Sequence, residues 1–113
     1  MDARPWKIIS FEEVSSTNDV AQQYSGKKMS FRAVIWAKRQ THGRGRNGHS
    51  WQSLEDNLFF SIITPFPLQH LGQLVILSTL SLWRTIYNLN TNLCLELKWP
   101  NDILLNKAKV SGI

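Results

Sequence analysis

A glycine-rich loop between two apolar runs is the feature that most constrains the fold of this chain. Residues 38–50 are polar and contain three glycines, whereas residues 31–37 and 57–64 are apolar enough to be buried strands. A connection of that length without regular structure is unusual in a compact domain. Its centre satisfies G-x-G-x-x-G, the pattern of a dinucleotide-binding turn, with the residues Gly43-Arg44-Gly45-Arg46-Asn47-Gly48.

The context of these glycines argues against a dinucleotide site. That site needs a helix directly after the turn, with its N-terminus facing the pyrophosphate. Here a polar segment and a β run follow Gly48, and no Gly-Lys-Ser/Thr of a P-loop is present. The glycines instead indicate a flexible segment that brings Arg44 and Arg46 onto an anion, because guanidinium groups offer paired donors to phosphate or carboxylate. Trp51 beyond them either stacks on a base or anchors the loop in the core.

The remaining pattern predicts an α/β (α+β) fold with a mixed or antiparallel sheet, strands in hairpins and helices packed on one face. A capping segment predicts a short helix from Ser16 to about Tyr24, closed by Gly26. Apolar residues at helical spacing predict a core helix over 71–89. Further strands are expected near residues 7–11, 94–99, 103–105 and 109–113, with turns at 100–102 and 106–107.

Composition limits the class of protein. A chain of 113 residues with a net charge of +5 is one small domain or a piece of one. Between Val20 and Leu54 there are seven Lys or Arg and no acid, so this stretch is either a phosphate-attracting surface or a solvated basic face.

The most apolar run, 74–83, is too short to cross a bilayer. A single cysteine, Cys94, expected in the core, excludes an internal disulfide and predicts a cytoplasmic location. The three histidines, His42, His49 and His70, lack metal-ligand spacing and are expected at the surface.

Four segments, in order over about residues 8–113, resemble the motifs of the biotin protein ligases. The matching family patterns are S-T-N, G-R-G-R-x-G-x-x-W, K-W-P-N-D and K-x-[AS]-G-I. In this chain they are Ser16-Thr17-Asn18, Gly43 to Trp51, Lys98-Trp99-Pro100-Asn101-Asp102 and Lys109-Val110-Ser111-Gly112-Ile113.

The resemblance implies a class II synthetase-like biotin/lipoate ligase fold and a two-step reaction. Biotin and MgATP would give biotinyl-5′-AMP and pyrophosphate, and the biotinyl group would then pass to a lysine of a biotin carboxyl carrier protein. Biotin, ATP and Mg²⁺ would take part as substrates, without a tightly bound prosthetic group. Fixed cations fit this chemistry, because a carboxylate must approach a polyanion.

The resemblance also implies roles for individual residues. The expected catalytic groups are Lys109, Arg44 and Arg46. The expected biotin-binding residues are Ser16, Thr17, Asn18, Gln40, Gly43, Arg44, Arg46, Lys109 and Gly112. The expected nucleotide-binding residues are Arg46, Trp51, Lys98, Asn101 and Asp102, with Mg²⁺ near Asp102. Simpler interpretations remain open at two places, where Ser16 and Thr17 form only a helix cap and residues 100–102 form only a turn.

Two departures from the family pattern shape the expectation. Many bacterial relatives carry an N-terminal helix-turn-helix, whereas the motifs here begin within 16 residues, so a ligase without a DNA-binding domain is expected. The family's catalytic domain continues past the K-x-[AS]-G-I segment and ends in a small β domain. Residues 1–113 are therefore expected to be the N-terminal portion of a truncated catalytic domain, weak or inactive unless the missing half or a homodimer contact covers its sheet edge.

Two alternative functions remain. A lipoate ligase would carry an R-R-x-[ST]-G-G-G-A-V-x-H-D pattern, which this chain lacks. A nucleic-acid-binding module would use the basic, Trp-containing loop to contact phosphates and stack on bases. It would leave the K-W-P-N-D and K-V-S-G-I segments without a role.

Overall fold

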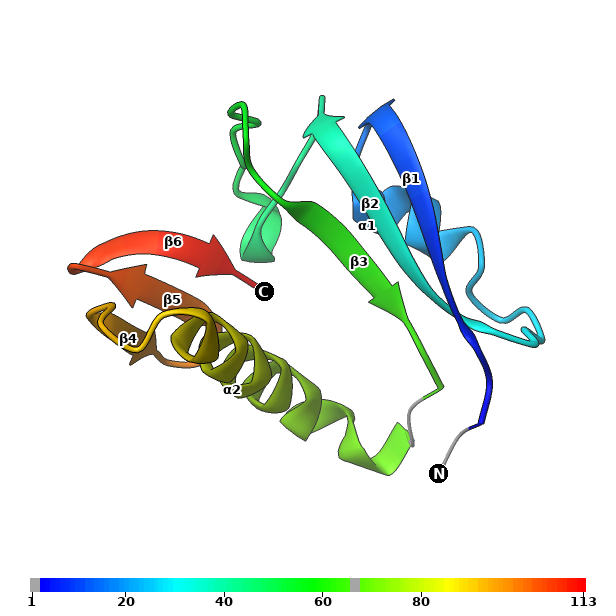
Figure 1. Cartoon of the computed structure of the whole chain (residues 1–113). Coiled ribbons are helices and arrows are strands. Elements are labelled where there is room, and N and C mark those ends of the chain that lie inside the picture. The colour runs from blue at the N-terminus through cyan, green and yellow to red at the C-terminus, as the bar shows by residue number, and fades with distance from the viewer. Residues whose placement is uncertain (1–2, 66–67) are drawn as a thin grey trace. The chain divides into compact units, whose positions relative to one another are not determined.

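The computed structural model describes residues 3–65 and 68–113 (Figure 1). The chain divides into two compact units, Met1–Pro65 and Phe66–Ile113, and each is described by itself. Within the two described ranges, no helix combines the length with the apolar character that crossing a bilayer requires.

The first unit is a mixed three-stranded sheet with a short helix. Its strand order is β1-β2-β3, in which β1 and β2 are parallel and β2 and β3 are antiparallel. A parallel pair needs a crossover connection, and the segment containing α1 supplies it. The bounds are β1 (Trp6–Val14), α1 (Thr17–Gln22), β2 (Arg32–Gln40) and β3 (Phe59–Ile63). The prediction that the strands form hairpins is therefore wrong for the first pair.

The core of the first unit lies on one face of the central strand β2. Alternate residues of this strand, Ala33, Ile35 and Ala37, have no exposed surface, as the two-residue period of a strand requires. Ser61 of β3 is the register partner of Ile35, so the two side chains share that face. The Thr17 hydroxyl of α1 lies 2.9 Å from the Ser61 hydroxyl. Helix α1 therefore covers this face.

The second unit places a long helix against an antiparallel sheet of order β4-β5-β6. Thr79 in the helix is buried, and its hydroxyl lies 2.7 Å from the carbonyl of Val75 and 3.1 Å from the carbonyl of Pro100. Ile103 of β5 is fully buried. The bounds are η2 (Leu68–His70), α2 (Leu71–Leu89), β4 (Leu95–Lys98), β5 (Asp102–Leu105) and β6 (Ala108–Gly112).

Two turns shape this second sheet. Asn106 and Lys107 join β5 to β6 with φ values of 50° and 67°, and two positive φ values are the geometry of a type I′ hairpin turn. The β4–β5 turn contains a cis Trp99–Pro100 peptide bond, and Lys98 pairs with Asp102 across it. Both predicted turns are confirmed. Cys94 precedes β4 and is exposed, so its predicted core position is wrong.

Candidate active site

A first cluster of predicted site residues lies where β1 and β2 end. Because the two strands are parallel, their carboxyl ends meet at one edge of the sheet, which is where open α/β sheets bind ligands. Backbone hydrogen bonds join the segments that leave this edge, from the amide of Thr41 to the carbonyl of Val14 (3.0 Å) and from the amide of His42 to the carbonyl of Ser15 (2.8 Å). The start of α1 and the start of the glycine-rich segment are thereby held together.

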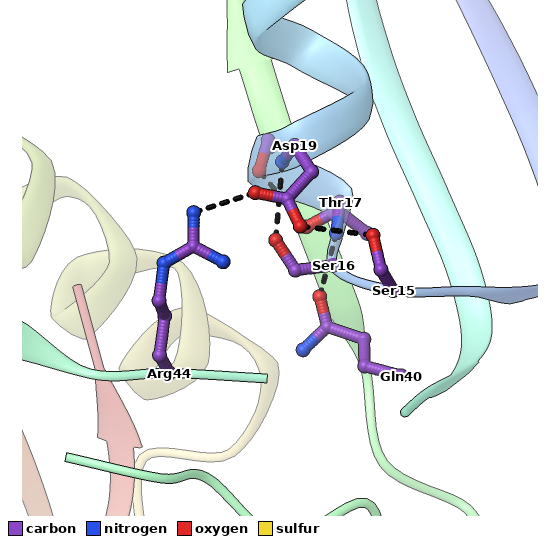
Figure 2. Close-up of polar contacts among 7 residues, drawn as sticks. Ser15, Ser16, Thr17, Asp19, Gln40 and Arg44 are labelled. Carbon is purple, nitrogen blue, oxygen red and sulfur yellow. Dashed lines mark hydrogen bonds and ion pairs between the residues drawn. The ribbon is translucent and has the colours of Figure 1, made fainter. Parts of the chain in front are cut away.

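Ser16 and Thr17 have different roles at the start of α1. Ser16 is the N-cap, with an extended φ of −155°, and its hydroxyl accepts a hydrogen bond from the amide of Asp19 (3.1 Å). Thr17 is buried, and its amide donates to the side-chain oxygen of Gln40 (2.7 Å). The cap interpretation thus holds for Ser16, whereas the Thr17 amide is bonded to Gln40 of β2 (Figure 2). The Thr17 hydroxyl also contacts Ser61 of β3.

Gly43 sits where a side chain would not fit. It is buried, and a Cβ atom on it would lie 2.8 Å from the Gln40 Nε2 and 3.1 Å from the carbonyl oxygen of Trp51. The amide of Trp51 donates to the carbonyl of Gly43 (2.7 Å), and the Trp51 side chain is half-buried. Glycine is therefore required by close approach, and Trp51 holds the base of the loop through its backbone.

Residues 43–50, called the arginine loop below, are more ordered than the sequence predicted. Strand β2 continues to Gln40, because residues 38–40 still extend along β1. Beyond it, an isolated bridge joins Arg44 to Ser50, and the amide of Gly45 donates to the carbonyl of His49 (2.6 Å). The tip is the short helix η1 (Arg46–Gly48). The predicted structureless connection over 38–50 is therefore wrong, since most of it is strand or bridged turn.

The two arginines of the loop have different surroundings. Arg44 Nη2 lies 2.5 Å from Asp19 Oδ1, so the guanidinium reaches back to α1. This hydrogen bond, followed by one from the Ser15 hydroxyl, holds the pKa of Asp19 below its usual range, and the same contact raises the pKa of Arg44. Arg46 lies exposed in η1, and Asn18 is exposed on α1.

A second cluster lies on the hairpin of the second unit. Asp102 Oδ1 is buried and lies 3.1 Å from Lys109 Nζ, an ion pair that is not aligned as a hydrogen bond. The Asn101 side-chain amide donates to the carbonyl of Ile113 (3.1 Å), whose own amide donates to the carbonyl of Asn101 (3.0 Å). Gly112 is the register partner of Asp102. The β4–β5 turn and the end of β6 are thereby fixed to each other.

Lys98 lies beside this cluster. It is exposed at the end of β4 and lines a largely apolar pocket of about 180 Å³ between α2 and the β4–β5 turn. Pro100 and Asn101 form the predicted turn, whereas Asp102 is the first residue of β5 and is paired with Lys109. In the ranges 3–65 and 68–113, no group of three or more His, Cys, Asp or Glu side chains is arranged to hold a metal ion.

Three residues of the first cluster make contacts that the sequence did not predict. The Asp19 carboxylate contacts Ser15 and Arg44, although its spacing from Ser16 fits an ordinary helix cap. Ser61 of β3 contacts Thr17, and the Ser53 hydroxyl accepts a hydrogen bond from the amide of Gln40 (3.0 Å). These contacts depend on the parallel pairing of β1 with β2, which the sequence did not predict. That pairing brings α1, Gln40 and the arginine loop to one edge of the sheet.

Comparison with known proteins identifies the family. The sequence profile of the Biotin/lipoate A/B protein ligase family matches residues 10–113, and the chain belongs to that family. The chain is 33% identical over 109 residues to the bifunctional ligase/repressor BirA of Bacillus subtilis, which covers 94% of this chain and 33% of BirA. It is 33% identical over 86 residues to the biotin–[acetyl-CoA-carboxylase] ligase of Mycobacterium tuberculosis, covering 71% of this chain and 32% of that ligase.

Solved structures give the same result. The biotin protein ligase of Aquifex aeolicus in complex with biotin and ATP matches with a TM-score of 0.77 and 34% identity, over 94% of this chain and 44% of that one. The biotin protein ligase of Leishmania major in complex with biotinyl-5-AMP matches with a TM-score of 0.79 and 25% identity, over 96% and 50%. These likenesses confirm the predicted fold class. The chain spans about a third of the curated relatives and about half of the solved chains.

Proposed function

We propose that this chain carries the biotin and nucleotide residues of an ATP-dependent biotin protein ligase. The observation that supports the proposal best is the first cluster, in which Thr17, Gln40, Gly43 and Arg44 meet at the carboxyl edge of a parallel strand pair. Related structures crystallised with biotin, ATP and biotinyl-5-AMP support the same substrates.

The first cluster suits a ligand with a polar head and a carboxylate tail. The hydroxyl of Thr17 and the amide group of Gln40 offer neutral donors and acceptors for the ureido ring of biotin. Gly43 lets Gln40 and the Trp51 carbonyl pack closely against the loop backbone. Arg44 and Arg46 would bring two guanidinium groups toward the carboxylate and phosphates. Ser16 and Asn18 would complete the biotin side, and Trp51 the adenine side.

The chemistry requires cations at the reacting atoms. In the first step a carboxylate oxygen of biotin attacks the α-phosphorus, the bond to the β-phosphate oxygen breaks, and pyrophosphate leaves. Lys109, with Arg44 and Arg46, would stabilise the charge on the pentavalent phosphorus, and the contact with Asp102 keeps the Lys109 ammonium oriented. In the second step the amine of the carrier lysine attacks the acyl carbon, loses a proton and displaces AMP.

Lys98, Asn101 and Asp102 are proposed on the nucleotide side, and Gly112 on the biotin side. Mg²⁺ would arrive as part of the MgATP substrate. Because the buried oxygen of Asp102 already contacts Lys109, the metal would take most of its ligands from phosphate oxygens and water. Asp102 would add at most one carboxylate oxygen.

The reaction can be tested by biotin-dependent exchange between ATP and pyrophosphate. Since the chain spans about half of the solved ligases, we propose that these 113 residues by themselves turn over weakly. The Lys109→Ala substitution in a full-length context should abolish exchange, whereas Lys107→Gly, which removes a lysine from the same hairpin, should leave it intact. Equal loss in both variants, or full exchange by Lys109→Ala, would refute the role of Lys109.

The arginine loop would also retain the adenylate, because exposure to water would hydrolyse it. Arg46→Gly should therefore increase the release of free biotinyl-5′-AMP. Release equal to that of the parent protein would contradict this role.

Three further points stay predictions. A carrier domain of a biotin-dependent carboxylase is the proposed acceptor, a homodimer is one way to cover the sheet edges, and a cytoplasmic location rests on the single cysteine. Lipoic acid in place of biotin should give no exchange, which separates this proposal from a lipoate ligase of the same family.

A further inference from the structure

Asp19 joins the arginine loop to helix α1 through contacts on both of its carboxylate oxygens. Oδ1 lies 2.5 Å from Arg44 Nη2, and Oδ2 accepts a hydrogen bond from the Ser15 hydroxyl (2.8 Å). The backbone amide of Asp19 is held by the hydroxyl of Ser16 (3.1 Å). Figure 2 shows the carboxylate between the serines and the guanidinium. Asp19 is therefore held by residues at the start of α1 as well as by the loop.

We propose that Asp19 is a positioning residue that holds the arginine loop beside Thr17 and Gln40 before a ligand binds, and presents Arg44 to an anionic ligand. The identity of that anion, the carboxylate of biotin, rests on the proposed function. The proposal that Asp19 orders the loop does not depend on the proposed function.

The backbone contacts of the loop explain why a side-chain link matters. The bonds from Trp51 to Gly43 and from Gly45 to His49 close the loop on itself, and they do not join its arginines to α1. Glycines at positions 43, 45 and 48 leave the segment many alternative conformations. A loop that is ordered for only a fraction of the time weakens ligand binding by that fraction. The Asp19–Arg44 contact raises the fraction of time for which the loop is ordered.

The geometry favours positioning over competition between Asp19 and the ligand. A guanidinium has five N–H donors, and the contact with Asp19 engages the Nη2 end. A ligand carboxylate can approach another edge of the same guanidinium while Asp19 stays in place. A competing Asp19 would instead have to leave Arg44 when the ligand arrives.

The ion pair between Glu12 and Lys38 in the same sheet provides a matched control. Lys38 Nζ lies 2.9 Å from Glu12 Oε1, and both side chains are largely exposed. This pair joins β1 to β2, which the strand ladder already holds together. Removing it should change neither the loop nor the ligand affinity.

The experiment compares Asp19→Asn with Glu12→Gln in the 113-residue chain. Asparagine keeps the size of the side chain and the amide that Ser16 caps, and it removes the charge that faces Arg44. Trypsin cleaves after arginine, so we expect cleavage after Arg44 and Arg46 to accelerate about threefold or more in Asp19→Asn and to stay unchanged in Glu12→Gln. Since exposed ion pairs are weak, biotin should bind about two- to fivefold less tightly by calorimetry.

A double-mutant cycle separates the pair from a general loss of structure. Arg44→Gln should accelerate cleavage after Arg46 as much as Asp19→Asn does, and the double variant should add little to either. Unchanged cleavage in Asp19→Asn, additive effects in the double variant, or tighter binding of biotin would each overturn the proposal. A lack of biotin heat in every variant would contradict the proposed function, and the cleavage rates would still decide the role of Asp19.

Discussion

The Gly43→Ala substitution is the sharpest test of the first cluster. The new Cβ would lie 2.8 Å from Gln40 Nε2 and 3.1 Å from the Trp51 carbonyl, and the first distance is shorter than real Cβ contacts allow. Gln40 cannot move freely, because its side-chain oxygen accepts the amide of Thr17 at 2.7 Å. The methyl group therefore either displaces Gln40 and breaks this bond or pushes the backbone of Trp51.

The magnitude follows from two opposing effects. Overpacking of a filled site costs about 1–3 kcal/mol, which includes about 1 kcal/mol for the lost hydrogen bond. The reduced freedom of the unfolded chain returns about 0.4–1 kcal/mol. The midpoints of these ranges give a net loss of about 1.3 kcal/mol, or a fall in Tm of about 5–10 °C at about 4–8 °C per kcal/mol for a unit of this size.

The measurement is thermal unfolding followed by circular dichroism, with Gly45→Ala as the control. Gly45 has a φ of −91°, and a Cβ atom there would meet only the His49 carbonyl at 3.7 Å, an ordinary contact. Gly45→Ala should therefore melt within about 2 °C of the parent chain. Equal melting temperatures for the two variants would refute the close approach at Gly43, as would unchanged affinity of Gly43→Ala for biotin.

Three other predictions concern stability. Arg44 lowers the pKa of Asp19, so this pair stabilises the folded chain above the ordinary pKa of 3.8, and that stabilisation is lost as the pH falls through the lower folded pKa. Asp19→Asn should remove this part of the acid dependence of urea unfolding. An identical pH profile in the variant would contradict the contribution of the pair. Lys107→Gly should stabilise the chain by about 0.5–1 kcal/mol in thermal unfolding, because Lys107 has a φ of 67° that glycine adopts without strain. A lower Tm in this variant would contradict the positive φ of Lys107 in the turn. Ile103→Ala should cost about 2–5 kcal/mol in urea unfolding, since Ile103 is fully buried, and a loss below about 1 kcal/mol would argue against its core position.

Much of the fold could be predicted from local signals. The buried strand over 31–37, the helix over 71–89 and both turns of the last three strands match the structure within a few residues. Each has a strong pattern, such as the apolar run of β2 or the Pro-Asn-Asp turn. The pairing of β1 with β2 could not be predicted, because the parallel direction depends on how α1 packs and not on the residues of either strand.

The candidate site, like the fold, could be predicted from the sequence only in part. The resemblance to the biotin protein ligases implied roles for Thr17, Gln40, Gly43 and Arg44, and the structure brings these residues together. The resemblance did not reveal Asp19, since a carboxylate three residues after a serine also fits an ordinary helix cap. Cys94 was misplaced because an apolar neighbourhood in sequence does not specify which side of a short edge segment faces the core.

Calorimetry with biotin, set against a single-stranded oligonucleotide, separates a biotin-binding site from a nucleic-acid-binding loop. We expect saturable heat with biotin that is weakened in Arg44→Gln, and no heat with the oligonucleotide at physiological salt. Salt-sensitive oligonucleotide binding without any biotin heat would contradict it, and would assign the basic arginine loop to nucleic acid.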